Sequence, residues 1–190
     1  MRSSRMTFVA ALVVVMGVLA VATTPTAQAK DKTELFLDCF SIQMDSGTTA
    51  NIEIGIERWS EPDERNTLIN VLVEQGTDKL LKAVQEIKPR AGFIRTAESL
   101  GWDVHFAQQS PLPGGGTRVV FMTDRPIGGL EARNQGRSMD YQFQLGQIQL
   151  NKDGGKKGSG TYVHAGKVAF DKKNKHIEIE NYGSEPVRFS

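Results

Sequence analysis

Alternation of apolar and polar residues recurs along most of the chain, and this pattern constrains the fold more than any other feature. In the clearest case Ile52, Ile54 and Ile56 alternate with polar residues and one glycine. A period of two is typical of β-strands, because successive side chains point to opposite faces of a sheet. Similar segments, separated by short turns, fill most of residues 90–190. The sequence therefore predicts about eight or nine strands in a mainly antiparallel sheet.

Residues 60–89 depart from this alternation and have helical spacing instead. Their apolar residues recur three or four positions apart in two groups, Leu68, Ile69, Leu72 and Val73, then Leu80, Leu81, Val84 and Ile87. Ser60 is a candidate N-cap, Gly76 separates the two groups and Pro89 ends the second. We therefore predict an α+β fold, in which a sandwich or barrel-like sheet carries an inserted helical hairpin.

The alternation changes parity within residues 139–150. Apolar residues occupy odd positions up to Leu145 and even positions from Ile148 onward. A single extra residue in a strand shifts the alternation in this way. The sequence therefore predicts a β-bulge next to Gly146.

Residues 1–29 have the three regions of a secretory signal peptide. Two arginines precede an apolar run over residues 8–22, and an A-x-A site ends at Ala29. The alternative is an uncleaved anchor, but the run is shorter than the roughly 20 residues that span a bilayer. We expect a periplasmic or secreted protein with no stable membrane insertion after cleavage, and a single globular domain over residues 30–190.

The composition excludes several classes of protein. The chain has 23 Lys and Arg against 22 Asp and Glu, with 39% hydrophobic and 24% charged residues, as in ordinary globular proteins. Lysines cluster at residues 152–157 and 172–175, two turns at opposite ends of an antiparallel sheet, with no interleaved aromatic residues. We expect no nucleic-acid partner, and a small molecule or an envelope component remains the open class of partner.

Motifs for cofactor and metal chemistry are missing from the sequence. It contains no phosphate-binding loop, no G-x-G-x-x-G, no G-x-S-x-G and no H-E-x-x-H. His105, His164 and His176 lie on three different predicted strands. We therefore expect no cofactor and no metal.

Cys39 is the single cysteine, and in an exported protein it is either a reactive thiol, an inter-chain disulfide partner or a buried side chain. Leu35, Leu37 and Cys39 share one face of a predicted strand, and Phe36 and Phe40 share the other. Strands that are apolar on both faces are usually covered on both sides. We predict that the thiol is buried and inert.

Residues 123–141 form a connection longer than most hairpin loops, and long loops on a rigid sheet often carry binding or catalytic residues. Its charged residues are the candidate ligand-binding residues Asp124, Arg125, Glu131, Arg137 and Asp140, together with Arg133. The two arginines Arg125 and Arg137 suit a carboxylate or phosphate, and Asp124 or Glu131 suits an acid–base role. In the alternative, structural interpretation, Asp124 and Asp140 pair with these arginines and hold the loop.

Four segments resemble a group of uncharacterised exported bacterial proteins: IGIERWS (54–60), TDRPI (123–127), RSMDY (137–141) and ENYGSEPVR (180–188). The resemblance implies export, a bacterial origin and single-domain size, and it assigns no site residue. We expect a non-enzymatic β-rich binding or envelope-associated domain. The alternative is a hydrolase or transferase that uses the acidic and arginine residues of the 123–141 loop.

Overall fold

The structure is a computed structural model that describes residues 33–43, 47–97, 99–125, 133, 136–152, 157–183 and 185–190. The predicted signal peptide lies outside these residues. Residues 31–190 form one compact unit. In the described segments, no helix has the length and apolar character needed to cross a membrane.

The described residues form a ten-stranded antiparallel sheet and two α-helices. The strands are β1 (Leu35–Ile42), β2 (Thr49–Ile56), β3 (Gly92–Thr96), β4 (Trp102–Val104), β5 (Phe106–Pro111), β6 (Thr117–Asp124), β7 (Phe143–Leu150), β8 (Gly158–Asp171), β9 (His176–Asn181) and β10 (Val187–Phe189). The helices α1 (Pro62–Gln75) and α2 (Thr77–Gln85) follow β2, and a 3₁₀-helix, η1 (Arg137–Asp140), precedes β7. The predicted α+β fold with a helical hairpin is confirmed.

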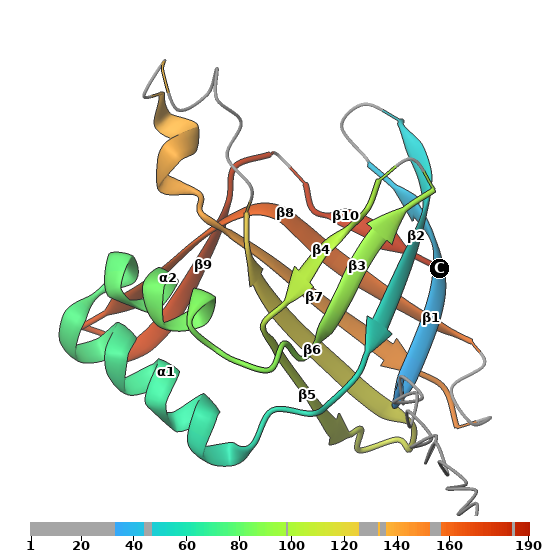
Figure 1. Cartoon of the computed structure of the whole chain (residues 1–190), viewed down its shortest axis with the longest axis horizontal. Helices are drawn as coiled ribbons and strands as arrows, with labels where there is room; N and C mark the ends of the chain where they lie inside the picture. Colours follow the sequence, from blue (N-terminus) through green and yellow to red (C-terminus); the bar gives the residue numbers. More distant parts are fainter. Residues whose placement is uncertain are drawn as a thin grey trace, which may run out of the picture. The chain divides into compact units, whose positions relative to one another are not determined.

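The sheet curls into a nearly closed barrel (Figure 1). Its strand order is β4-β3-β2-β1-β10-β8-β7-β6-β5, and β9 lies beside β8 off this path. The strands at the two ends of this order, β4 and β5, are separated in the sequence only by His105. The chain therefore turns at His105 from one end of the sheet to the other. The long strand β8 pairs with β10 near its start and with β9 over its second half.

Apolar side chains and one polar network fill the barrel. The largest apolar cluster combines inward residues of most strands, including Ile54, Ile94 and Phe121. Among them the side-chain oxygen Oε1 of Gln144 accepts hydrogen bonds from Trp102 Nε1 at 2.5 Å and from the Tyr162 hydroxyl at 2.7 Å. Such a buried network satisfies the polar groups that the interior encloses.

The hairpin begins one residue later than the sequence indicates. Glu61, not Ser60, is the N-cap of α1, and Glu64 accepts the Glu61 backbone N–H at 2.8 Å in a capping box. The Ser60 hydroxyl is used elsewhere, since it accepts the backbone N–H of Ala107 in β5 at 3.1 Å. Ser60 thus links the chain to β5 just before α1 begins.

The parity change in residues 139–150 has a different cause from the predicted bulge in that strand. In β7 the odd residues Phe143 and Leu145 pack toward the hairpin, while Ile148 lies in the barrel core. Both faces of β7 are therefore covered, each at a different position along the strand. The inward and outward alternation of the β7 side chains is unbroken. The register shift lies between Phe143 and Leu145, where the partner β8 carries the extra residue between Val163 and Gly166.

Strand β1 is covered on its inner face only. Cys39 is buried, unpaired and 7% exposed, and burial, followed by the charge of Asp38, raises the pKa of its thiol to about 11. The predicted burial is confirmed. The expectation of cover on both faces is wrong, because Phe36 and Phe40 are 52% and 45% exposed on the outside. Gly55 and Phe93 lie in the same cross-strand row as Phe36.

Candidate functional site

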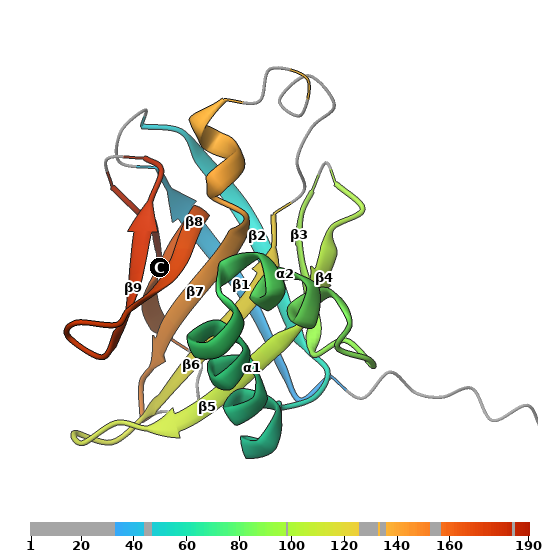
Figure 2. The same cartoon turned by 90° about the vertical axis from the view of Figure 1, so that its left-hand side faces the viewer.

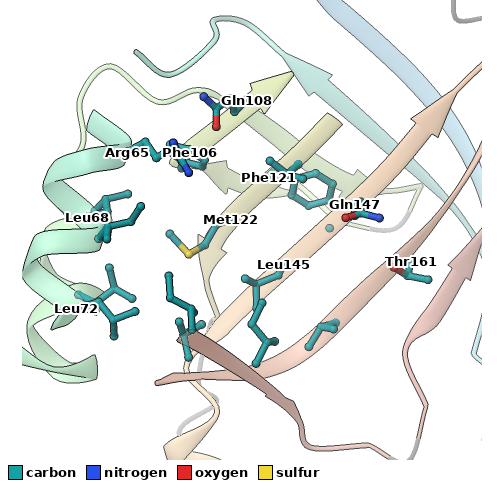
Figure 3. A pocket seen from close by; sticks show the side chains of 18 residues that line it. Arg65, Leu68, Leu72, Phe106, Gln108, Phe121, Met122, Leu145, Gln147 and Thr161 are labelled. Atoms are coloured by element: carbon teal, nitrogen blue, oxygen red, sulfur yellow. The ribbon is translucent and has the colours of Figure 1, made fainter. Parts of the chain in front are cut away.

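An open cleft of about 510 Å³ separates the helical hairpin from the outer face of the sheet. Figure 2 shows the two helices lying across the β5–β7 side of the barrel, and Figure 3 shows the cleft at close range. Its lining is mainly apolar: Leu68, Ile69, Leu72, Leu80, Phe106, Val120, Phe121, Met122, Leu145, Gly146, Val163, Val168, Ile177 and Ile179, with Arg65, Gln108, Gln147 and Thr161 as the polar members. This volume lies in the range of small-molecule sites.

The register of four strands divides the floor of the cleft into two rows. The apolar row runs across β5, β6, β7 and β8 and consists of Phe106, Met122, Leu145 and Val163. The next row, two residues along each strand, consists of Gln108, Val120, Gln147 and Thr161. The rows are about 7 Å apart, because each strand residue rises about 3.4 Å. The floor is therefore apolar on one side and carries amide and hydroxyl groups on the other.

The hairpin forms the opposite wall and is anchored at both of its helices. Leu72 and Val84 belong to a second apolar cluster with Phe143 and Val168 of the sheet. The Thr77 hydroxyl at the start of α2 donates to the Val168 carbonyl at 2.7 Å. These contacts position α1 above the floor.

A bidentate ion pair stabilises the start of α1. Both terminal nitrogens of Arg58 contact the Glu64 carboxylate at 2.9 Å, and this contact lowers the pKa of Glu64. The Arg58 Nε also donates to the carbonyl of Pro89 at 2.9 Å. The chain entering α1 is thereby tied to the chain leaving the hairpin.

Strand β9 forms the side of the cleft and leaves two large apolar residues exposed. Ile177 and Ile179 line the cleft and are 42% and 55% exposed. They pair with Phe170 and Val168 of β8, whose outer face is packed against the hairpin cluster. The cleft therefore has an apolar side wall that the described part of the chain leaves open to solvent.

The candidate residue Asp124 lies at the end of β6 and joins three elements. Its carboxylate accepts a hydrogen bond from Gln85 Nε2 of α2 at 2.9 Å and lies 3.4 Å from His105 Nε2. The contact with His105, supported by Gln85, lowers the pKa of Asp124 to about 2. Nε2 is the ring nitrogen of His105 that faces the Asp124 carboxylate, and Nδ1 is buried with no partner among the described residues.

Arg125 and Arg137 bind groups of the protein around η1. The Arg125 guanidinium donates to the carbonyls of Tyr141 and Ser138 at 2.6 and 2.8 Å. One terminal nitrogen of Arg137 contacts the Tyr141 hydroxyl at 2.9 Å and Glu180 at 3.0 Å. The Tyr141 hydroxyl also donates to Glu180, which lowers the pKa of that carboxyl. The two arginines therefore attach η1 to the end of β6 and to β9.

The remaining candidates are Asp140 and Glu131. Asp140 is exposed and lies 3.8 Å from Lys167 Nζ, and Glu131 lies outside the described residues. Asp124 and Asp140 thus have other partners than the predicted Arg125 and Arg137. Arg137 and Asp140 both lie on η1 and contact Glu180 and Lys167, whereas Asp124 contacts His105 and Gln85, so the described candidates have different partners.

Three residues at the β8–β9 turn have metal-ligating side chains. The potential ligand atoms of Asp171, His176 and Glu178 lie within 4.8 Å of one another. The Asp171 carboxylate, however, already accepts the backbone N–H groups of Lys173 and Asn174 and the Asn174 side chain. These hydrogen bonds close the β8–β9 turn, and this structural role accounts for Asp171 without a metal ion.

The residues of the cleft were not candidates from the sequence, because they have the composition of a core. The available signal was the alternation of Ile177 and Ile179 on a strand whose other face is charged. The chain matches no protein-family model, no curated protein and no solved structure. The resemblance to exported bacterial proteins stays a prediction, and the geometry of the cleft is the main guide to function.

Proposed function

We propose that this protein is a non-enzymatic, exported bacterial binding protein, and that the cleft between the hairpin and the sheet holds an apolar small molecule. The observation that carries the proposal is the open apolar side wall formed by Ile177 and Ile179. Covering such a wall with a ligand is favourable, at about 25 cal/mol for each Å² of apolar surface removed from water. The ligand would be a component of the periplasm, the envelope or the medium.

Binding of a neutral naphthylamine dye, followed by its fluorescence, tests this proposal. We expect saturable binding to the purified protein. Ile179→Glu should weaken the dye affinity about tenfold or more, because it introduces a charge into an apolar site. Phe36→Glu is the matched control: Phe36 is 52% exposed, close to the 55% of Ile179, and lies on β1 away from the cleft. Absence of saturable binding, or equal losses in the two variants, would contradict the proposal.

Export is tested by the mass of the protein recovered from the periplasm and from the medium of an expressing bacterium. We expect a chain that begins at Lys30, since the A-x-A site ends at Ala29. Recovery of the chain with residues 1–29 still attached, in the membrane fraction, would show an anchor instead.

The alternative function is a hydrolase or transferase that uses the 123–141 loop. A carboxyl is most effective as a general acid or base near neutral pH when its pKa is raised toward that pH. The pKa of Asp124 is lowered to about 2, and the Arg125 guanidinium donates to main-chain carbonyls. These observations favour the binding protein over the enzyme.

A further inference from the structure

We infer that the ligand of this cleft is an anionic single-chain amphiphile, of which a fatty acid is the simplest example. The inference rests on the proposed binding function and adds the chemistry of the head group. It follows from the way in which polar and charged groups are distributed around the cleft.

Arg65 is the only ionisable residue in the cleft lining, which includes no carboxylate among the described residues. Arg65 is exposed on α1, and the described residues provide no ion-pair partner for its guanidinium. The neighbouring acid Glu64 is already bound to Arg58 at 2.9 Å. The cleft therefore has a net positive charge and an arginine fork that is open to a carboxylate or phosphate.

The hydrogen-bonding groups of the floor lie in one cross-strand row. Gln108, Gln147 and Thr161 occupy this row together with Val120. Figure 3 shows Arg65 beside Phe106 and near Gln108, at the β5 edge of the floor, while Gln147 and Thr161 lie further across the sheet and Leu72 is further along the helix. The side-chain amide of Gln108 can donate its N–H groups to the oxygens of an anionic head group, so Gln108 and Arg65 suit the same end of a ligand.

A second arginine extends the positive end. Arg118 of β6 is exposed, and it precedes Val120 by two residues on the same outer face, about 7 Å further from the apolar row. Its cross-strand neighbours are the uncharged Ser110 and Gln149. Positive charge thus continues beyond the polar row.

The other end of the cleft suits an apolar chain. The apolar row leads away from the β5 edge through Met122, Leu145 and Val163, then to Val168 and to Ile177 and Ile179 of β9, without a charged side chain in this part of the lining. A charged group at this end would lose its hydration with no partner to replace it. The head group is therefore expected at the Arg65 end and the tail along β9.

Titration calorimetry with three ligands of equal chain length tests the inference: dodecanoate, dodecanol and dodecyltrimethylammonium. We expect dodecanoate to bind about tenfold more tightly than dodecanol, as one charge-assisted contact allows, and the cationic ligand to bind most weakly. The affinity for dodecanoate, but not for dodecanol, should fall as salt is raised, because salt screens an exposed ion pair.

Two variants assign this preference to Arg65. Arg65→Gln should remove the difference between dodecanoate and dodecanol, whereas Arg65→Lys should keep part of it. Lys79→Gln is the matched control, since it removes one exposed positive charge from the same hairpin without lining the cleft. It should leave the preference unchanged.

The outcomes separate the two proposals. Equal binding of dodecanoate and dodecanol, or an unchanged preference in Arg65→Gln, would overturn the anionic head group while leaving an apolar binding site. Tighter binding of dodecyltrimethylammonium than of dodecanoate would also overturn the anionic head group and leave the apolar binding site. Failure of all three ligands and of the neutral dye to bind would overturn the binding function itself.

Discussion

Replacing Gly146 by alanine should destabilise the barrel by about 1–3 kcal/mol, the usual cost of overpacking a core. Gly146 of β7 lies opposite Phe121 of β6 and faces the barrel interior. A Cβ atom at this position would lie 2.0 and 2.2 Å from two carbon atoms of the Phe121 ring. Since Phe121 is only 2% exposed, its ring has little space into which it can move.

Thermal unfolding followed by circular dichroism measures this effect. For a chain of this size each kcal/mol shifts Tm by about 2–4 °C, so Gly146→Ala should lower Tm by about 2–12 °C. Gly114→Ala is the control, because nothing lies within 4 Å of its added Cβ, and its Tm should stay unchanged or rise slightly. Adding Phe121→Leu to Gly146→Ala should cost less than the sum of the two single changes.

Equal Tm values for Gly146→Ala and Gly114→Ala would refute the register between β6 and β7. A shift by one residue would move Gly146 to the outer face and reverse the faces of all its neighbours in β7. The same register places Gln147 beside Val120, and Leu145 beside Met122, on the cleft floor. The variant therefore also tests the division of the floor into a polar and an apolar row.

Three further predictions concern the residues singled out by the sequence. Asp124→Asn should lower the free energy of unfolding by about 1–2 kcal/mol at pH 7, after allowance for solvent screening. Because the pKa of Asp124 in the folded protein is about 2, the wild type should lose this stability as the pH falls from about 4 to 2. The same pH dependence of urea unfolding in both proteins would contradict this prediction. Cys39, with a thiol pKa of about 11, should react slowly with iodoacetamide at pH 7.5 in the folded protein and rapidly in urea; fast labelling of the folded protein would show an accessible thiol. Tyr141→Phe should lower the free energy of unfolding by about 1 kcal/mol, because the hydroxyl joins η1 to Glu180; an unchanged thermal unfolding curve would show that the contact contributes nothing.

Much of the fold could be predicted from local patterns. Ile52, Ile54 and Ile56 alternate because one face of β2 is in the barrel core, and the hairpin has helical spacing because one face of each helix packs on the sheet. These signals need only neighbouring residues. The N-cap was misplaced for a related reason: Ser60 has a capping side chain, but its hydroxyl binds Ala107, which is distant in the sequence.

The cleft could not be predicted, because its floor depends on contacts between distant strands. The extra residue of β8 between Val163 and Gly166 changes which residues face the hairpin, so that Val163 and Val168 both line the cleft despite their opposite parity. No pattern within one strand reveals this. In β7, cover on both faces produced a parity change that resembled a bulge, and the actual irregularity lies in its partner.

The contrast between the charged loop and the apolar cleft has a physical basis. Charged side chains in a connection often bind main-chain carbonyls that lack partners, as Arg125 does for Tyr141 and Ser138. Charged residues in a loop therefore indicate contacts that stabilise the loop as readily as they indicate a ligand site. Strand β9 pairs with β8 alone, and its apolar residues Ile177 and Ile179 are exposed. While they are exposed, these side chains do not stabilise the fold by burial. In this protein the unsatisfied surface is apolar, and it lies where the hairpin stands away from the sheet, which is why the cleft rather than the loop is the stronger candidate for binding.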